Sequence, residues 1–145
     1  MRLNEFEFPD DLKYMKGHIW IKMEGDEAVV GLTSFGSSLT KEIVHIDMPE
    51  NNTEFKSMEP MASFETIKSV NEIHAPFNCR VIEVNEKLFD NPSLINSDPY
   101  GDGWILRLKI IDNINMGDLM DVNEAVGYYK KILIKEKERY KGIYD

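Results

Sequence analysis

The chain has 145 residues, of which 42% are hydrophobic and 30% charged, and its formal net charge is −9. This length predicts a single domain over residues 1–145, and no apolar run is long enough to span a bilayer. The acidic balance argues against nucleic acid and anionic membrane surfaces as partners, because both need a basic binding surface, and it favours partner proteins with basic patches.

Most of the chain is predicted to form short antiparallel strands between turn signals. Residues 1–13 are expected to pack a few aromatic side chains and to turn at Pro9. In chain order we then expect a hairpin of residues 18–24 and 27–33, a short helix or loop over 34–40, a strand over 42–48, a hairpin of residues 61–66 and 70–75, a strand over 77–84, one or two helical turns within 85–97, a strand over 104–111 and an amphipathic helix over about 123–140. In the strand over 42–48, the alternation places Val44, Ile46 and Met48 on one face. The pattern predicts a mainly β sandwich or barrel with a core over about 14–112 and a C-terminal helix packed on the sheet.

The N-terminus and the cysteine content predict a cytoplasmic protein. Residues 1–7 carry acidic groups and no apolar segment of the kind that a secretory signal needs. The single cysteine, Cys79, cannot form an internal disulfide, which fits a reducing compartment. Cys79 lies in a strand pattern and is expected to be a small core residue, so any redox chemistry must come from an added group.

The polypeptide offers no candidate catalytic constellation. Its three histidines, His18, His45 and His74, lie in separate predicted strands without the paired spacing of metal ligands. Each is therefore expected to be a structural strand residue. We expect a protein that is not itself an enzyme.

Lys68 lies at the predicted turn of the hairpin formed by residues 61–66 and 70–75. A side chain at such a tip points away from the body of the protein. Its amine, on a four-carbon stem, is well placed to be acylated by another enzyme. From spacing alone, an ordinary solvated lysine in a turn is the favoured interpretation. The surrounding sequence is therefore needed to decide whether Lys68 is an acylation site.

The segment Glu65-Thr66-Ile67-Lys68-Ser69 resembles the lipoylation motif of the glycine cleavage system H-protein family. Further segments are similar to landmarks of this family in the same order, and together they span roughly residues 14 to 130. They are His18-Ile19-Trp20, Gly31-Leu32-Thr33, Ala75-Pro76, Glu83-Val84-Asn85 and the run from Asn91 to Trp104. The resemblance therefore covers nearly the whole chain.

The resemblance implies a lipoyl/biotinyl-domain-like barrel-sandwich hybrid with lipoate attached to Lys68 by an amide. It also implies a set of residues that the modifying enzyme could recognise: Glu65, Thr66, Ile67, Ser69 and Glu72. Of the two glutamates, Glu65 matches the motif, whereas Glu72 is better explained as a solvent-facing strand residue. The cofactor would hold the chemistry, and the protein would supply its position.

The same resemblance implies the partners and the cycle. A monomeric, non-catalytic carrier would take the aminomethyl group of glycine from a glycine decarboxylase (P protein) to an aminomethyltransferase (T protein). Dihydrolipoamide dehydrogenase (L protein) would then reoxidise the arm by thiol–disulfide exchange. A lipoate ligase or lipoyl-transfer enzymes would attach the cofactor.

Several positions depart from the family pattern. Cys79 replaces a usual glycine, Leu39-Thr40-Lys41 stands in for a Leu-Gly-Asp/Glu turn, and two further positions keep alternatives open. Ile19 replaces a carboxylate, and Phe35 stands where many members carry a histidine; both positions help to shelter the loaded arm in the family. The second interpretation is an H-like lipoate-binding carrier for another assembly, such as heterodisulfide-reductase-like sulfur oxidation, and the third is an unmodified scaffold. A biotin carrier is disfavoured, because Ile67 and Ser69 flank the lysine in place of methionines.

Overall fold

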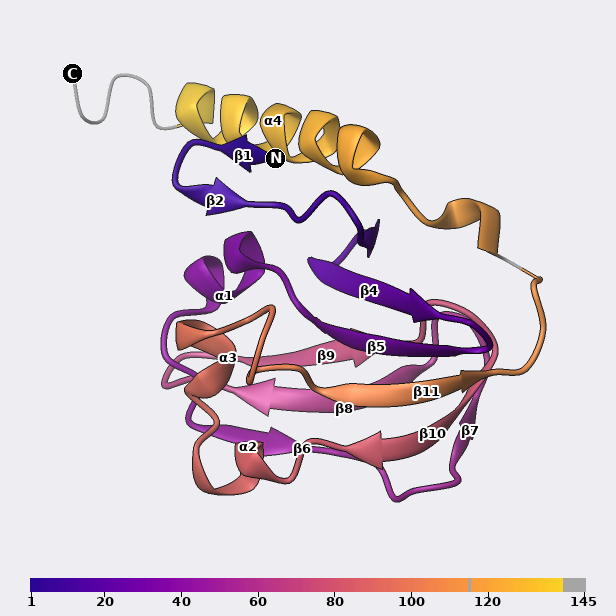
Figure 1. The fold of residues 1–145 in the computed structure, drawn as a ribbon. Helices are drawn as coiled ribbons and strands as arrows, with labels where there is room; N and C mark the ends of the chain where they lie inside the picture. Colours follow the sequence, from indigo (N-terminus) through magenta and orange to yellow (C-terminus); the bar gives the residue numbers. More distant parts are fainter. Residues whose placement is uncertain (115, 140–145) are drawn as a thin grey trace.

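The fold consists of two main antiparallel sheets with a long helix across one side (Figure 1). This computed structural model describes residues 1–114 and 116–139. The six-stranded sheet has the spatial order β3 (Lys13–Met15), β4 (Ile19–Glu24), β5 (Glu27–Leu32), β11 (Leu106–Ile110), β10 (Cys79–Val84) and β7 (Glu54–Phe55). The three-stranded sheet has the order β6 (His45–Asp47), β8 (Pro60–Glu65) and β9 (Val70–His74), and a small separate sheet pairs β1 (Arg2–Leu3) with β2 (Phe6–Glu7). The predicted mainly β, lipoyl-domain-like architecture is confirmed.

The helices are short apart from the last one. They are α1 (Ser34–Thr40), α2 (Lys87–Asp90), α3 (Leu94–Ser97), the 3-10 helix η1 (Met116–Asp118) and α4 (Val122–Arg139). The one or two helical turns predicted within 85–97 are present as α2 and α3, and the long helix was predicted within a residue of its observed start. Position 140, its predicted end, lies outside the described residues. Among the described residues, no helix combines the length and the apolar composition that crossing a bilayer requires.

The β4–β5 hairpin forms as predicted because its turn and its apolar runs agree. Gly25 occupies the left-handed region with φ +65, which glycine adopts easily, and the first pair of the ladder joins Glu24 to Glu27. Side chains on opposite faces of these strands enter two different cores, since Ile21 lies in one and Trp20 in the other. This double burial explains why β5 and the first half of β4 are nearly continuous apolar runs.

The first core lies between the two main sheets. It joins residues of β4, β5, β10 and β11 to Ile46, Phe64 and Ile73 of the three-stranded sheet, all of which are buried. Each fully buried side chain of this size contributes roughly 1.5–3 kcal/mol of transfer free energy. The three-stranded sheet, which carries Lys68 near its end, is therefore anchored along its inner face.

The second core is rich in aromatic side chains and holds α4 in place. The Tyr129 ring stacks on Phe8 with a centroid distance of 4.9 Å and lies 4.9 Å from Phe35 of α1. In Figure 1, α4 crosses above β1 and β2, and its contacts with strands are to β3 and β1. The predicted packing on a sheet is thus confirmed at β3, and the N-terminal segment supplies part of the surface.

The strand predicted over 42–48 is too long: its alternation holds over residues 45–48, where Ile46 is buried and Met48 packs against the first core, but not at residues 43 and 44. Only His45–Asp47 forms β6, and Val44 is 50% exposed while Ile43 is buried. The side-chain oxygen of Asn96 in α3 accepts a hydrogen bond from the Ile43 N–H at 3.0 Å. This contact holds the chain against α3 before it joins the sheet, so the strand alternation begins only at the sheet itself.

Candidate functional site

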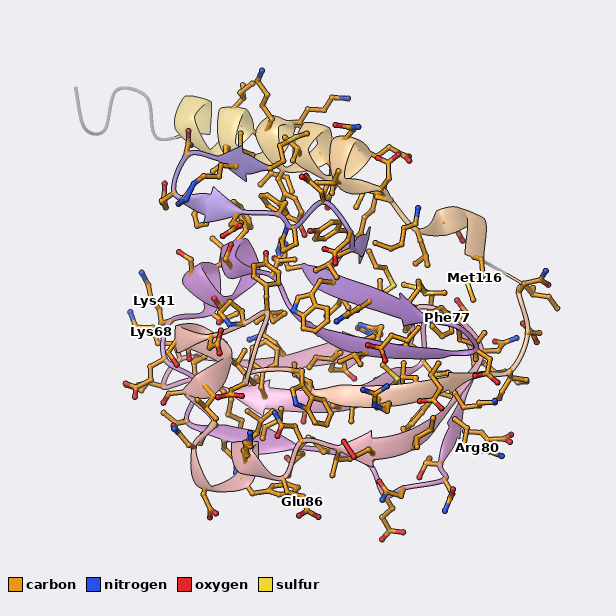
Figure 2. The ribbon with its side chains drawn as sticks, in the orientation of Figure 1. Lys41, Lys68, Phe77, Arg80, Glu86 and Met116 are labelled. Atoms are coloured by element: carbon orange, nitrogen blue, oxygen red, sulfur yellow. The ribbon has the colours of Figure 1, made fainter. Side chains whose placement is uncertain are left out.

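The β8–β9 hairpin is present as predicted, with Lys68 in its four-residue tip. The last ladder pair joins Glu65 to Val70, and the Thr66 N–H donates to the Ser69 carbonyl at 2.9 Å to close the turn. Lys68 is exposed, and Figure 2 shows its side chain projecting from one edge of the molecule, opposite the edge where Met116 lies. The two paired strands therefore carry the lysine at the end of a rigid support.

The tip is organised by the hydroxyl of Thr66. Its Oγ1 accepts hydrogen bonds from the backbone N–H groups of Lys68 at 3.3 Å and Ser69 at 3.2 Å, and it lies 3.1 Å from Ser69 Oγ. Asn71 in turn donates from Nδ2 to Ser69 Oγ at 3.0 Å. This arrangement is a side-chain-to-backbone turn of the kind that serine and threonine favour. Thr66 and Ser69 were predicted from the motif, whereas Asn71 was not.

The surface beside Lys68 is apolar. Ile67 is 87% exposed, the highest fraction among the large hydrophobic residues described, and Val70 is 66% exposed. In the described part of the chain, no carboxylate lies within salt-bridge distance of the Lys68 ammonium. Any protein surface that receives the amine therefore has to cover exposed aliphatic side chains.

The two glutamates of the predicted site lie on one outer face of the three-stranded sheet. Glu65 is half-buried and faces His45 across the ladder, while its carbonyl accepts a hydrogen bond from the Val44 N–H at 2.8 Å. Glu72 is exposed and pairs with Ser63, two residues before Glu65 on the same strand. Glu65 is therefore the less exposed of the two glutamates.

Lys41 has a strained backbone conformation that the sequence did not predict. It ends α1 with φ +61 and ψ −161, a backbone region that belongs almost entirely to glycine. Asn96 Nδ2 donates to the Lys41 carbonyl at 2.6 Å and holds this connection in place. Figure 2 shows the Lys41 and Lys68 side chains at the same edge of the molecule. A lysine at a helix end gives no sequence signal for such a conformation.

The other candidate reactive residues do not gather at this site. Burial raises the pKa of the Cys79 thiol to about 12, in agreement with its predicted place in the core. The prediction that each histidine is a strand residue is wrong for His18, which precedes β4 with φ +68 and lies 3.2 Å from the Tyr129 hydroxyl. Among the described residues, no group of three or more His, Cys, Asp and Glu side chains could hold a metal ion.

The two departures from the family pattern that keep alternatives open lie in the cores. Ile19 is 2% exposed in the first core, and Phe35 is 2% exposed in the second. An apolar side chain is the type expected at such positions. Packing alone therefore accounts for both residues, and neither one requires a different cargo.

The comparisons with known proteins agree with this fold. The Glycine cleavage H-protein family model matches residues 12–132. A glycine cleavage system H protein of Halothermothrix orenii is 37% identical over 124 residues, which cover 86% of this chain and 97% of that protein. The one from Acaryochloris marina is 42% identical over 105 residues, covering 72% and 82%. A crystal structure of a glycine cleavage system H protein from Mycobacterium marinum matches with a TM-score of 0.78 at 29% identity, covering 85% of this chain and 99% of that chain. The chain belongs to the glycine cleavage H-protein family.

Proposed function

We propose that this chain carries lipoate as an amide on Lys68 and uses that arm to move the aminomethyl group of glycine between enzymes. Membership of the family gives the chain the role of lipoyl carrier in glycine cleavage. The observation that supports the attachment site is the exposed lysine at the tip of a braced hairpin, inside the matched region 12–132.

The residues around Lys68 suit such a group. Within the described residues the amine has no ion pair to give up when acylation removes its charge. Ile67 and Val70 offer apolar surface beside the first part of an aliphatic arm. Lipoate, when attached, supplies a redox-active disulfide at the end of a long flexible chain.

The attachment step needs only the amine of this chain and an activated donor. The deprotonated Lys68 Nζ attacks the carbonyl carbon of an activated lipoyl compound, an acyl adenylate or an acyl thioester bound by the modifying enzyme. A C–N bond forms, the bond from the carbonyl carbon to the leaving group breaks, and the leaving group takes the electron pair. The nitrogen loses a proton and becomes an uncharged amide.

The partners of the carrier follow from the same proposal. Glycine decarboxylase, aminomethyltransferase and dihydrolipoamide dehydrogenase would each receive the tip of the hairpin, and a lipoate ligase or lipoyl-transfer enzyme would modify it. The chain would act as a monomeric, non-catalytic subunit in the cytoplasm. Its net charge of −9 fits partner surfaces that are basic around their active-site entrances.

The alternative of a carrier for sulfur oxidation is not favoured. The relatives that match over most of the chain are glycine cleavage system H proteins, and the two departures that raised the alternative are core residues. The experiment that separates the two roles is reconstitution with glycine decarboxylase. Glycine decarboxylation should depend in a saturable way on the lipoylated chain, whereas a sulfur carrier would leave it at the background rate.

The attachment site is tested with the variant Lys68→Arg. We expect the wild-type chain to gain the mass of one lipoyl group when it is incubated with a lipoate ligase, lipoate and ATP, and the variant to gain none, because arginine keeps the charge but lacks an acylatable amine. Intact-mass measurement detects the lipoyl adduct, or its absence, in both proteins. A variant that still gained the lipoyl mass would place the attachment at another residue.

The two glutamates provide a matched pair for recognition by the modifying enzyme. Glu65→Gln should lower the kcat/KM of enzymatic lipoylation several-fold, because the half-buried Glu65 carries the carboxylate of the motif beside the turn. Glu72→Gln should change it by less than about twofold, as expected of an exposed carboxylate on the outer face. Equal effects of the two substitutions would remove Glu65 from the recognition set.

A further inference from the structure

We propose that the Thr66 hydroxyl is a positioning group for the acylation of Lys68, a role that rests on the proposed function. Thr66 itself does not touch the acyl donor. It fixes the backbone of the tip, so that the modifying enzyme meets the amine in one presentation.

Few other contacts could restrain the tip. Ile67, Lys68, Ser69 and Val70 are all exposed, so packing does not order them. The turn is held by the backbone bond from Thr66 N–H to the Ser69 carbonyl and by the hydrogen bonds that converge on Thr66 Oγ1. Without that oxygen, the N–H groups of Lys68 and Ser69 would turn to water and the tip would sample more conformations.

The side chain of a lysine is flexible, so the positions that its amine can reach depend on where the backbone holds its Cα atom. A fixed turn keeps the Lys68 Cα at a constant place relative to the two strands that the enzyme recognises. A turn without these hydrogen bonds must become ordered when the modifying enzyme binds it. The conformational entropy lost in that step raises the activation free energy of acylation. The effect should therefore be large for an enzyme and absent for a small reagent that attacks the amine from any direction.

Threonine suits this role because its side chain is restricted about χ1 and keeps the oxygen near the turn. Thr66→Val preserves the branched shape and removes the acceptor. Thr66→Ser preserves the acceptor and relaxes the rotamer. Comparing the two variants therefore separates the effect of the hydroxyl from the effect of the side-chain shape.

The test measures lipoylation of the full chain by a lipoate ligase with lipoate and ATP. We expect Thr66→Val to lower kcat/KM about tenfold, which corresponds to about 1.4 kcal/mol. Thr66→Ser should stay within about threefold of the wild type. Acylation of Lys68 by a small amine-reactive ester, followed by peptide mapping, should be the same in all three proteins.

A matched control removes a threonine hydroxyl elsewhere. Thr53 Oγ1 donates to the Glu50 carbonyl at 2.7 Å in the turn before β7, away from the β8–β9 hairpin. Thr53→Val should leave the kcat/KM of lipoylation unchanged. Amide hydrogen exchange at Lys68 and Ser69 should accelerate in Thr66→Val and not in Thr53→Val, while the thermal unfolding midpoint verifies that both variants are folded.

The outcomes distinguish the inference from the function on which it rests. If the wild type is not lipoylated on Lys68, the proposed function fails and the role of Thr66 falls with it. If the wild type is lipoylated and Thr66→Val matches it in kcat/KM, only the positioning role is overturned. A loss that Thr66→Ser does not restore, or an equal loss with the small reagent, would also overturn it.

Discussion

At the scale of single residues, the backbone at Lys41 is a clear source of strain. Its φ of +61 and ψ of −161 lie in a region that only glycine enters without steric conflict, and such a residue costs on the order of 1–3 kcal/mol. Lys41→Gly should therefore raise the free energy of unfolding by about 1 kcal/mol, after the extra freedom that glycine gives the unfolded chain is subtracted. Urea denaturation of the unmodified protein measures this change.

Lys41→Ala is the matched control, because it removes the same side chain but keeps the β-carbon that causes the conflict. We expect it to leave the free energy of unfolding within about 0.5 kcal/mol of the wild type. If alanine stabilised the protein as much as glycine did, the charge of Lys41 and not its backbone would be the cause.

The sequence predicted which residues occupy the hairpin tip better than the contacts that they make there. Lys68 and its neighbours were found from their motif and from the turn between two strand patterns. The role of Thr66 could not be read in the same way, because it depends on the hydroxyl meeting two N–H groups after the turn has formed. The conformation of Lys41 depends likewise on Asn96, which lies 55 residues away along the chain.

At the scale of elements, His18 connects the start of β4 to α4. Its ring lies 5.3 Å from Phe35 and 5.5 Å from Tyr129, measured between centroids, and burial lowers the pKa of the imidazole below its usual 6.5. The folded state thus favours the neutral ring. The stabilisation from His18 is complete above about pH 6.5 and is lost as the pH falls through the lower pKa of the folded state.

The variant His18→Asn tests this assignment, since asparagine tolerates a positive φ and does not titrate. Between pH 7 and pH 5 the wild type should lose unfolding free energy more steeply than the variant, by at most about 1.4 kcal/mol per pH unit for one proton. Above pH 7 the two curves should run parallel. Parallel curves over the whole range would mean that His18 takes up its proton equally in the folded and unfolded chains.

The elements themselves were predicted where local signals suffice. Both long hairpins, the turns near Pro92 and α4 follow from turn chemistry and from apolar spacing, whereas residues 34–40, which form α1, were expected only as a short helix or loop. The strand over 42–48 was extended too far, because the contact between Ile43 and Asn96 is distant in sequence and leaves no periodic pattern. The sequence also predicted that residues 1–13 pack aromatic side chains, but it did not predict that α4 covers them, because this contact joins segments that are distant in the chain.

At the scale of the whole molecule, the parts that keep the fold rigid are distinct from the part that carries Lys68. Two cores brace the sheets and the long helix, while the tip of the β8–β9 hairpin stands exposed at one edge (Figure 2). The chain covers 97% of the H protein from Halothermothrix orenii, so this arrangement spans nearly all of that relative. A carrier needs such a division, because the arm must reach several active sites while the body keeps its shape.

The most direct test of the account is the intact mass of the protein purified from its native cells, followed by peptide mapping across Lys68. The account predicts a mass increase of one lipoyl group, located on the peptide that contains Lys68. An unmodified Lys68, in cells whose other lipoate-dependent proteins carry the cofactor, would contradict the carrier role.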